Sequence, residues 1–213
     1  MLAAVAQAIS PICRCEIAVD DRHALNASYP AAFSDQYLRP EVRLEIGPLA
    51  AWLPCGSYKI RSYAAESFPQ IFSQADCAVQ AIRAERTFWE KATILHHEAN
   101  RQEGNQQPPR YSRHYYDLAM MAASPVKGVA LADLALLEDV AAFKHRFYPR
   151  GWARYDLAKP GTLKLVPSWH VLPSLKKDYA QMRNMIFGRY PSFDEIMEIL
   201  QALEREINNI QRG

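Results

Sequence analysis

The sequence predicts an α+β fold in which a small mixed or antiparallel sheet is followed by a C-terminal helical bundle. Apolar and polar residues alternate in several short stretches before residue 83, which is typical of strands. After that residue, apolar side chains recur at spacings of three and four, which is typical of amphipathic helices. The chain has 213 residues, of which 49% are hydrophobic, enough for one large domain or two small ones. We therefore expect residues 1–83 to form an α/β part and residues 84–213 a helical domain.

The first part is predicted to contain one helix and four strands. Residues 2–10 favour a short helix that ends at the following proline. The strand candidates alternate, or are short and apolar, and they cover residues 13–20, 41–46, 58–63 and 77–82. Residues 20–36 are predicted to be a long loop. In the second strand Glu45 lies on the polar face, where Lys59 or Arg61 of a neighbouring strand can pair with it.

The second part is predicted to be largely helical. Helices are expected over residues 84–99, 111–122 and 129–146, and an irregular stretch over 147–167. A further helix runs from Leu172 to Ile186 and is closed by Gly188. The run Ser192-Phe193-Asp194-Glu195 is a capping box that begins the last helix. We expect the last two helices to form an antiparallel hairpin.

The composition argues against several classes of protein. The formal net charge is only +2, which disfavours a strongly cationic nucleic-acid-binding protein while leaving room for a local basic patch. Two of the four cysteines are separated by a single residue and no second pair follows at zinc spacing, so we expect reduced thiols. No apolar run approaches the roughly 20 residues that cross a bilayer, and no basic residue precedes the apolar start. We expect a cytoplasmic protein without a membrane segment.

Lys91 and Asp117 are the residues on which a functional reading depends. Lys91 lies at the edge of the apolar stripe of its helix, where a partly desolvated ammonium can bind a nucleotide phosphate. It can equally be a lysine whose stem covers the core while its head reaches water. Asp117 follows Arg113 by one helical turn, so the two can form a local ion pair. Alternatively, Asp117 turns towards Lys91 and acts as a metal ligand or a base.

Other candidate ligands are weaker. Glu45 projects from a strand, where it can be a metal ligand or a solvated residue of the sheet surface. His96 and His97 are adjacent on a helix and point about 100° apart, so they cannot both face one metal. His97 and Arg101 have a spacing that is ordinary for a helix surface. No set of metal ligands is predicted within the chain.

Three runs of residues resemble the nucleotidyltransferase AbiEii/AbiGii toxin family, from about Tyr29 to the end of the chain. They are Tyr37-Leu38-Arg39-Pro40-Glu41-Val42-Arg43-Leu44-Glu45-Ile46-Gly47, Glu85-Arg86-Thr87-Phe88-Trp89-Glu90-Lys91-Ala92 and Ser112-Arg113-His114-Tyr115-Tyr116-Asp117-Leu118. Two shorter runs further along are also similar, Arg154-Tyr155-Asp156 and Met185-Ile186-Phe187-Gly188. The resemblance is specific because these motifs occur in the order in which the family has them.

The resemblance implies a fold of the DNA-polymerase-β-like nucleotidyltransferase superfamily and a toxin of a bacterial toxin–antitoxin or phage-defence system. The implied chemistry is transfer of a nucleoside monophosphate from a nucleoside triphosphate, with Mg²⁺, onto an acceptor that in some members is tRNA. By this resemblance Lys91 contacts the triphosphate, Asp117 completes the active site and Glu45 is a weaker catalytic candidate. Arg86 and Arg113, from the same motifs, are the expected substrate-binding residues.

The chain also departs from the family pattern. Members carry a Gly-Gly-(Ser/Thr) segment and then an Asp-x-Asp whose carboxylates hold the metal ions, and this sequence contains no Asp-x-Asp. We therefore expect an incomplete nucleotidyltransferase-like core, the C-terminal portion of a longer member, inactive alone. The alternative is a non-catalytic remnant that binds a protein, such as an antitoxin, or a nucleic acid. In that case an exposed apolar patch is expected on the sheet, with self-association through its edge or face.

Overall fold

A computed structural model describes residues 2–35, 37–46, 51 and 53–210. The chain divides into two compact units, which are described separately. The first contains residues 1–50 and 180–190, and the second contains residues 51–179 and 191–213. The predicted boundary near residue 83 marks a change of secondary structure, from the last strand to the first long helix. As a domain boundary it stays a prediction.

The first unit is built on helix α1 (Leu2–Ile9) and a three-stranded antiparallel sheet. Its strands are β1 (Arg14–Ile17), β2 (Ala24–Ser28) and β3 (Glu41–Glu45), with β2 in the centre. The strands predicted over 13–20 and 41–46 are confirmed, but the predicted loop over 20–36 is wrong where β2 lies. Leu25 is the one large apolar residue of β2 and is fully buried. A strand so short, with small and polar neighbours, gives almost no alternating pattern.

Arg43 in the centre of β3 organises the charges of this sheet. Its guanidinium contacts Asp20 at 3.1 Å and Glu45 at 3.0 Å. The predicted pairing of Glu45 with Lys59 or Arg61 is therefore wrong, because those two cations belong to the other sheet. These ion pairs are largely exposed, so each adds little to stability.

The second unit begins with an antiparallel ribbon of two strands, β4 (Cys55–Arg61) and β5 (Asp76–Ile82). Tyr58 lies opposite Val79, and this register places Lys59 and Arg61 around Asp76, at 3.1 and 2.9 Å. Helix α2 (Tyr63–Ser67) and a 3-10 turn (Pro69–Ile71) connect the strands. Both predicted strands are confirmed, and β4 begins three residues earlier than predicted.

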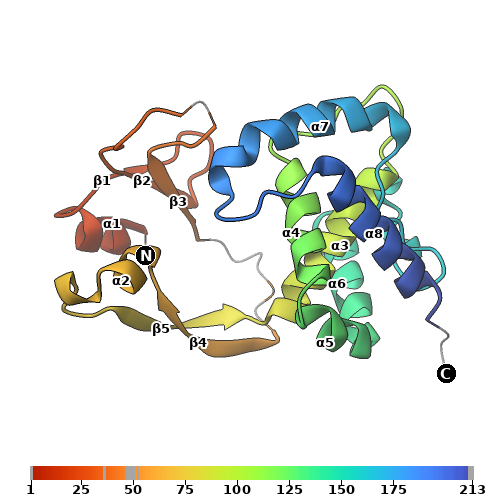
Figure 1. Ribbon diagram of the computed structural model, residues 1–213, viewed down its shortest axis with the longest axis horizontal. Coiled ribbons are helices and arrows are strands. Elements are labelled where there is room, and N and C mark those ends of the chain that lie inside the picture. The colour runs from red at the N-terminus through yellow and green to blue at the C-terminus, as the bar shows by residue number, and fades with distance from the viewer. Residues whose placement is uncertain (1, 36, 47–50, 52, 211–213) are drawn as a thin grey trace. The chain divides into compact units, whose positions relative to one another are not determined.

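Helix α3 (Ala84–Ala99) has the predicted bounds and lies at the centre of the second unit (Figure 1). Phe88, Trp89 and Leu95 are completely buried, and the Trp89 indole donates to the carbonyl of Ala130 at 3.2 Å. Three other helices contact α3, namely α4 (Ser112–Ala122), α5 (Val126–Ala132) and α6 (Leu134–Phe147). A helix buried on several sides needs apolar residues beyond a single stripe, which is why the phenylalanine and the tryptophan are consecutive.

The helix predicted over 129–146 is interrupted. Asp133 follows the last residue of α5 and is the N-cap of α6. Its side chain accepts a hydrogen bond from the backbone N–H of Leu136 at 3.0 Å. Aspartate is a preferred N-cap residue because its carboxylate accepts a hydrogen bond from a backbone N–H that has no partner within the helix. Asp133 therefore indicates a helix start within residues 129–146, although the apolar spacing there continues without a break.

The C-terminal helices are α7 (Leu172–Gln181) and α8 (Phe193–Asn208). The capping box is confirmed, because Ser192 accepts from the backbone of Glu195 at 3.1 Å and Glu195 accepts from the backbone of Ser192 at 2.7 Å. Among the described residues α8 packs along α4, whereas α7 meets α8 at its start, where Lys176 lies 3.3 Å from Asp194, so the predicted antiparallel hairpin is wrong. Further 3-10 turns cover Gly151–Ala153, Tyr155–Leu157, Trp169–Val171 and Met182–Met185.

A carboxylate on α7 fixes the start of α4. Asp178 accepts hydrogen bonds from the backbone N–H groups of Arg110 and Ser112, at 2.8 and 2.9 Å, and from the Ser112 hydroxyl. The first N–H groups of a helix have no partner within it, so an anion placed there satisfies them and complements the helix dipole. The orientation of α4 thus depends on a residue 66 positions further along the chain.

The α+β class is confirmed, with antiparallel sheets of three and two strands in the part of the chain that the structure describes. Several apolar side chains on the strands are exposed, among them Ile17, Val42 and Ile60. Within the described ranges, none of the helices is both long and apolar enough to cross a membrane. Self-association through a sheet stays a prediction.

Replacing Asp178 by alanine is expected to lower the free energy of unfolding by about 2–3 kcal/mol, because three donors at the start of α4 lose a charged acceptor. Denaturant unfolding followed by circular dichroism measures this. Asp139→Ala removes the same group from an exposed position on α6 and is the matched control, expected within about 0.5 kcal/mol of the parent. Equal effects of the two changes would contradict the assigned role of Asp178.

Candidate functional site

Lys91 of α3 and Asp117 of α4 form an ion pair on the second unit. The Lys91 ammonium donates to Asp117 Oδ2 at 2.7 Å, and it also lies 3.2 Å from His114 Nδ1. The side chain of Lys91 is 21% exposed and that of Asp117 is 38% exposed. Both groups can therefore be reached from solvent while the stem of the lysine lies against the core. Asp117 thus turns towards Lys91, and its role as a metal ligand or a base stays a prediction.

His114 is the neutral partner in this arrangement. An ammonium group can only donate, so Nδ1 must accept and the ring carries its proton on Nε2. Burial of the ring, together with the charges of Lys91 and Arg113, lowers the pKa of His114 to about 3. The imidazole thus stays uncharged at neutral pH and holds Lys91 without competing with it for a negative ligand.

A second lysine approaches the same turn of α3 from α6. Lys144 Nζ donates to the backbone carbonyl of Glu90 at 2.9 Å, and Glu90 immediately precedes Lys91. Burial lowers the pKa of Lys144 to about 8, with Glu90 opposing the shift and Lys91 adding to it. Two cations on neighbouring helices therefore stand around one turn of α3, which favours an anionic ligand there.

The two expected substrate-binding arginines differ in exposure, because Arg86 is buried and Arg113 is exposed. Arg86 is 4% exposed, and its guanidinium contacts Glu90 at 3.1 Å and the carbonyl of Leu53. Those contacts attach the segment before β4 to α3. Arg113 is exposed on α4, one residue before His114, and remains available to a substrate. A substrate-binding role for either arginine stays a prediction.

Glu45 lies in the first compact unit, where its carboxylate pairs with Arg43 at 3.0 Å. Lys91 and Asp117 belong to the second unit, so convergence of all three residues in one cleft stays a prediction. The structure brings together two of the three catalytic candidates.

His96, His97 and Glu98 form a buried polar cluster on α3 rather than part of its surface. Glu98 is completely buried and accepts two hydrogen bonds of 2.7 Å from Arg101. Burial alone would raise the pKa of Glu98, but the bonds from Arg101 and His97 outweigh it and the pKa is lowered. The spacing of His97 and Arg101 had suggested a helix surface, but His97 is buried and both residues contact Glu98.

His114 and Lys144 belong to the site but were not predicted from the sequence. His114 lies within a motif that had been identified, three residues before Asp117, and this spacing places both on one face of α4. That periodicity was available as a signal. Lys144 carried none, because its place beside α3 depends on the break at Asp133 and on how α6 then packs.

The carboxylates near Lys91 form ion pairs with neighbouring cations. Asp117 pairs with Lys91, and Glu90 pairs with Arg86. In the ranges that the structure describes, no three His, Cys, Asp or Glu side chains are grouped so that they could hold an ion.

Comparison with protein families identifies one match. It covers residues 3–199, and the family is described as "Nucleotidyl transferase AbiEii toxin, Type IV TA system". The matched region includes the strands of the first unit as well as Lys91 and Asp117, so it begins before the resemblance seen in the sequence alone. No curated protein and no solved structure matches the chain.

The unfolding free energy is expected to fall on acidification because of His114. Its folded pKa of about 3 lies below the unfolded value of about 6.5, so the unfolded state binds a proton first, and stability is lost as pH falls from 6.5 towards 3. Between pH 7 and pH 5 the loss is about 2 kcal/mol. Denaturant unfolding of the parent, His114→Asn and the exposed control His145→Asn at both pH values measures it. An unchanged pH dependence in His114→Asn would contradict this assignment.

Proposed function

This chain belongs to the nucleotidyl transferase AbiEii toxin family of type IV toxin–antitoxin systems, and from that membership we propose how its helical unit takes part in nucleotidyl transfer. The proposed reaction moves a nucleoside monophosphate from a nucleoside triphosphate onto an acceptor such as tRNA. Lys91 binds the triphosphate and Asp117 receives the acceptor. The proposed setting is the cytoplasm of a bacterium, with phage defence as the role and an antitoxin protein as the regulating partner.

The contact between Lys91 and Asp117 carries the proposal. An ammonium group has three N–H donors, and Asp117 and His114 accept two of them, at 2.7 and 3.2 Å. The third donor is available to a phosphate oxygen. Because both partners hold the ammonium in place, little side-chain freedom remains to be lost when the triphosphate binds. Lys144, behind the same turn, adds positive charge that favours a polyanion.

Asp117 has two functions in this scheme. It orients Lys91, and its exposed carboxylate can accept a hydrogen bond from the hydroxyl of the acceptor. Transfer requires the hydroxyl oxygen to attack the α-phosphorus while pyrophosphate leaves, and the hydroxyl proton must move to a base as the new bond forms. Asp117 is the proposed base, with Lys91 balancing the negative charge of the phosphates.

Metal ions, when bound in such enzymes, would supply stabilisation of the negative charge on the triphosphate. By resemblance their ligands lie in an Asp-x-Asp segment, which this sequence does not contain. We therefore propose that the chain as it stands binds the triphosphate but requires additional carboxylates for transfer. We propose that these carboxylates are missing because the chain is a truncated form of a longer family member.

Lys91→Ala is expected to weaken nucleoside triphosphate binding at least tenfold, because a charge-assisted hydrogen bond to phosphate contributes about 1.5–3 kcal/mol. Fluorescence anisotropy with the four labelled nucleoside triphosphates, with and without Mg²⁺, measures this. Lys127→Ala removes an equal charge from an exposed pair with Glu206 and is the control. Asp117→Asn is expected to bind at least as tightly as the parent, since a negative charge near the phosphates is removed. Equal affinities of the Lys91→Ala and Lys127→Ala variants would refute phosphate binding by Lys91.

Transfer itself is tested with labelled nucleoside triphosphates, Mg²⁺ and total tRNA. The chain alone is expected to leave the tRNA unlabelled, because the metal-binding carboxylates of the family pattern are missing from its sequence. Robust labelling that disappears in Lys91→Ala would show that the chain is a complete enzyme, and the proposed truncation would then be abandoned.

A further inference from the structure

The positive charge of the chain is concentrated in one segment of the helical unit, residues 144–164. It contains six Lys and Arg residues and one Asp, a net charge of +5, whereas the whole chain carries only +2. The cations are Lys144, Arg146, Arg150, Arg154, Lys159 and Lys164. Among the described residues, one of these cations, Arg154, forms an ion pair with Asp156 at 3.2 Å. We call this stretch the basic segment.

Aromatic rings alternate with the cations of the basic segment. Phe147 and Tyr148 are 40% and 47% exposed, although aromatic residues usually lie inside. The Arg146 guanidinium lies 5.3 Å from the centre of the Phe147 ring, and that of Arg150 lies 5.9 Å from Trp152. Exposed rings among arginines suit a ligand with both phosphates and flat bases, because bases stack on rings while cations bind the backbone. An acidic peptide would use the cations but not the rings.

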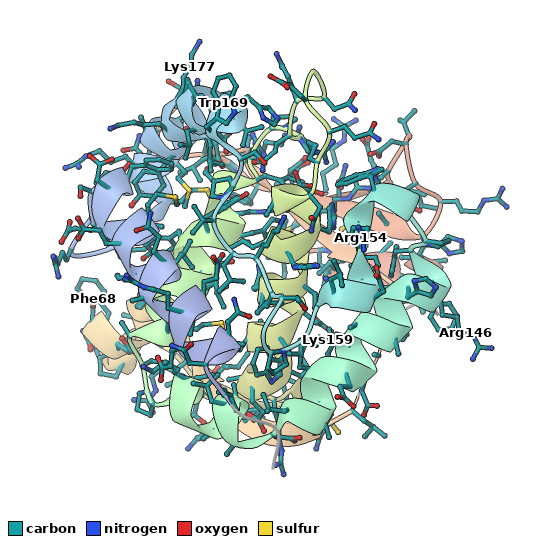
Figure 2. The ribbon with its side chains drawn as sticks, turned by 90° about the vertical axis from the view of Figure 1, so that its right-hand side faces the viewer. Phe68, Arg146, Arg154, Lys159, Trp169 and Lys177 are labelled. Atoms are coloured by element: carbon teal, nitrogen blue, oxygen red, sulfur yellow. The ribbon has the colours of Figure 1, made fainter. Side chains whose placement is uncertain are left out.

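The surface beside this segment is hollowed. A groove of about 480 Å³ lies between α6 and the turn at Tyr155–Leu157. Its lining combines small side chains with two carboxylates, one lysine and two rings, namely Ala141, Ala142, Ala158, Glu138, Asp156, Lys159, His145 and Tyr155. Its size is within the range of about 300–1,000 Å³ that is usual for small-ligand sites. Figure 2 shows Arg146 projecting from α6, and it labels Arg154 and Lys159 on the turns beside that helix. Small side chains in the groove allow a base to approach closely.

His96 of α3 holds the basic segment at two points. Its Nε2 lies 2.9 Å from the carbonyl of Arg154, and its Nδ1 accepts from the backbone N–H of Lys164 at 3.0 Å. Arg154 has a φ of +50°, in the left-handed region that residues other than glycine seldom adopt. Such a conformation persists only when its surroundings impose it, and it is found disproportionately at binding sites. The irregular stretch is thus fixed in position before any ligand arrives.

The basic segment also begins at the candidate active site. Its first cation, Lys144, donates to the carbonyl of Glu90, the residue before Lys91. A strand whose phosphates follow the segment towards Lys144 therefore reaches the turn that carries Lys91. We propose that the basic segment binds a single-stranded stretch of the acceptor RNA and directs it to Lys91 and Asp117. The choice of an acceptor as ligand rests on the proposed transferase function, whereas the binding itself does not.

The proposal is tested by fluorescence anisotropy with a labelled single-stranded RNA of about 12 nucleotides and the matching duplex. The single strand is expected to bind more tightly, because its bases can stack. Arg146→Gln, Arg150→Gln and Lys159→Gln combined are expected to weaken binding at least tenfold at about 0.1 M salt and to reduce the slope of log K against log salt by about 2. The matched control combines Lys127→Gln, Lys176→Gln and Lys177→Gln, with the same change of net charge.

The ring contribution is tested separately. Tyr148→Ala is expected to weaken binding of the single strand about 5- to 100-fold, while Tyr148→Phe keeps the parent affinity. Equal loss in the two triple variants, tighter binding of the duplex, or displacement of the RNA by polyglutamate at equal charge concentration would overturn the proposal. The last result would indicate an acidic protein as the partner.

RNA binding by the basic segment can be confirmed or refuted separately from the transferase proposal. Lys91→Ala is expected to lose nucleoside triphosphate and keep the single-stranded RNA, whereas the triple variant of the basic segment shows the reverse. If the parent binds no nucleoside triphosphate but binds RNA through this segment, the transferase proposal fails and RNA binding stands. If it binds nucleoside triphosphate but the triple variant retains RNA, the present inference fails alone.

Discussion

The burial of helix α3 is the constraint on which the helical unit depends. Phe88, Trp89 and Leu95 are inaccessible to solvent, and α4, α5 and α6 pack on the helix that carries them. The same helix carries Lys91 at the margin of its buried surface. Because the core fixes the rotation of α3, it also fixes the direction in which Lys91 points. Close packing of apolar side chains around α3 therefore holds the candidate site in place.

Polar groups inside this core are each held by complementary partners. Glu98 is completely buried and satisfied by Arg101, and His96 is completely buried with a partner at each ring nitrogen. Unpaired buried charges would cost several kcal/mol, so these contacts are required once the residues are inside. They also determine where the chain after α6 runs. The polar interior of the unit thus places its surface loops, in particular the basic segment.

Elements whose evidence is local were predictable from the sequence. Helix α3 was predicted to the residue, and the capping box at Ser192 has both of its hydrogen bonds. Elements that depend on distant contacts were not predictable. Strand β2 exists because two neighbours pair with it, and Lys144 reaches α3 only through the packing of α6. Lys91 and Asp117 were identified from motifs, and the spacing of three residues between His114 and Asp117 would have identified His114 as well.

The bond network of Asp178 has a consequence for the timing of synthesis. The start of α4 takes its acceptor from a residue that the ribosome adds 66 positions after Ser112. A nascent chain therefore contains Lys91 and Asp117 long before the carboxylate that anchors their second helix has been translated. Until then, the first N–H groups of α4 lack this charged acceptor, and the first turn of the helix can fray. The order of translation thus makes the anchor at the start of α4 one of the later contacts of this unit to become available.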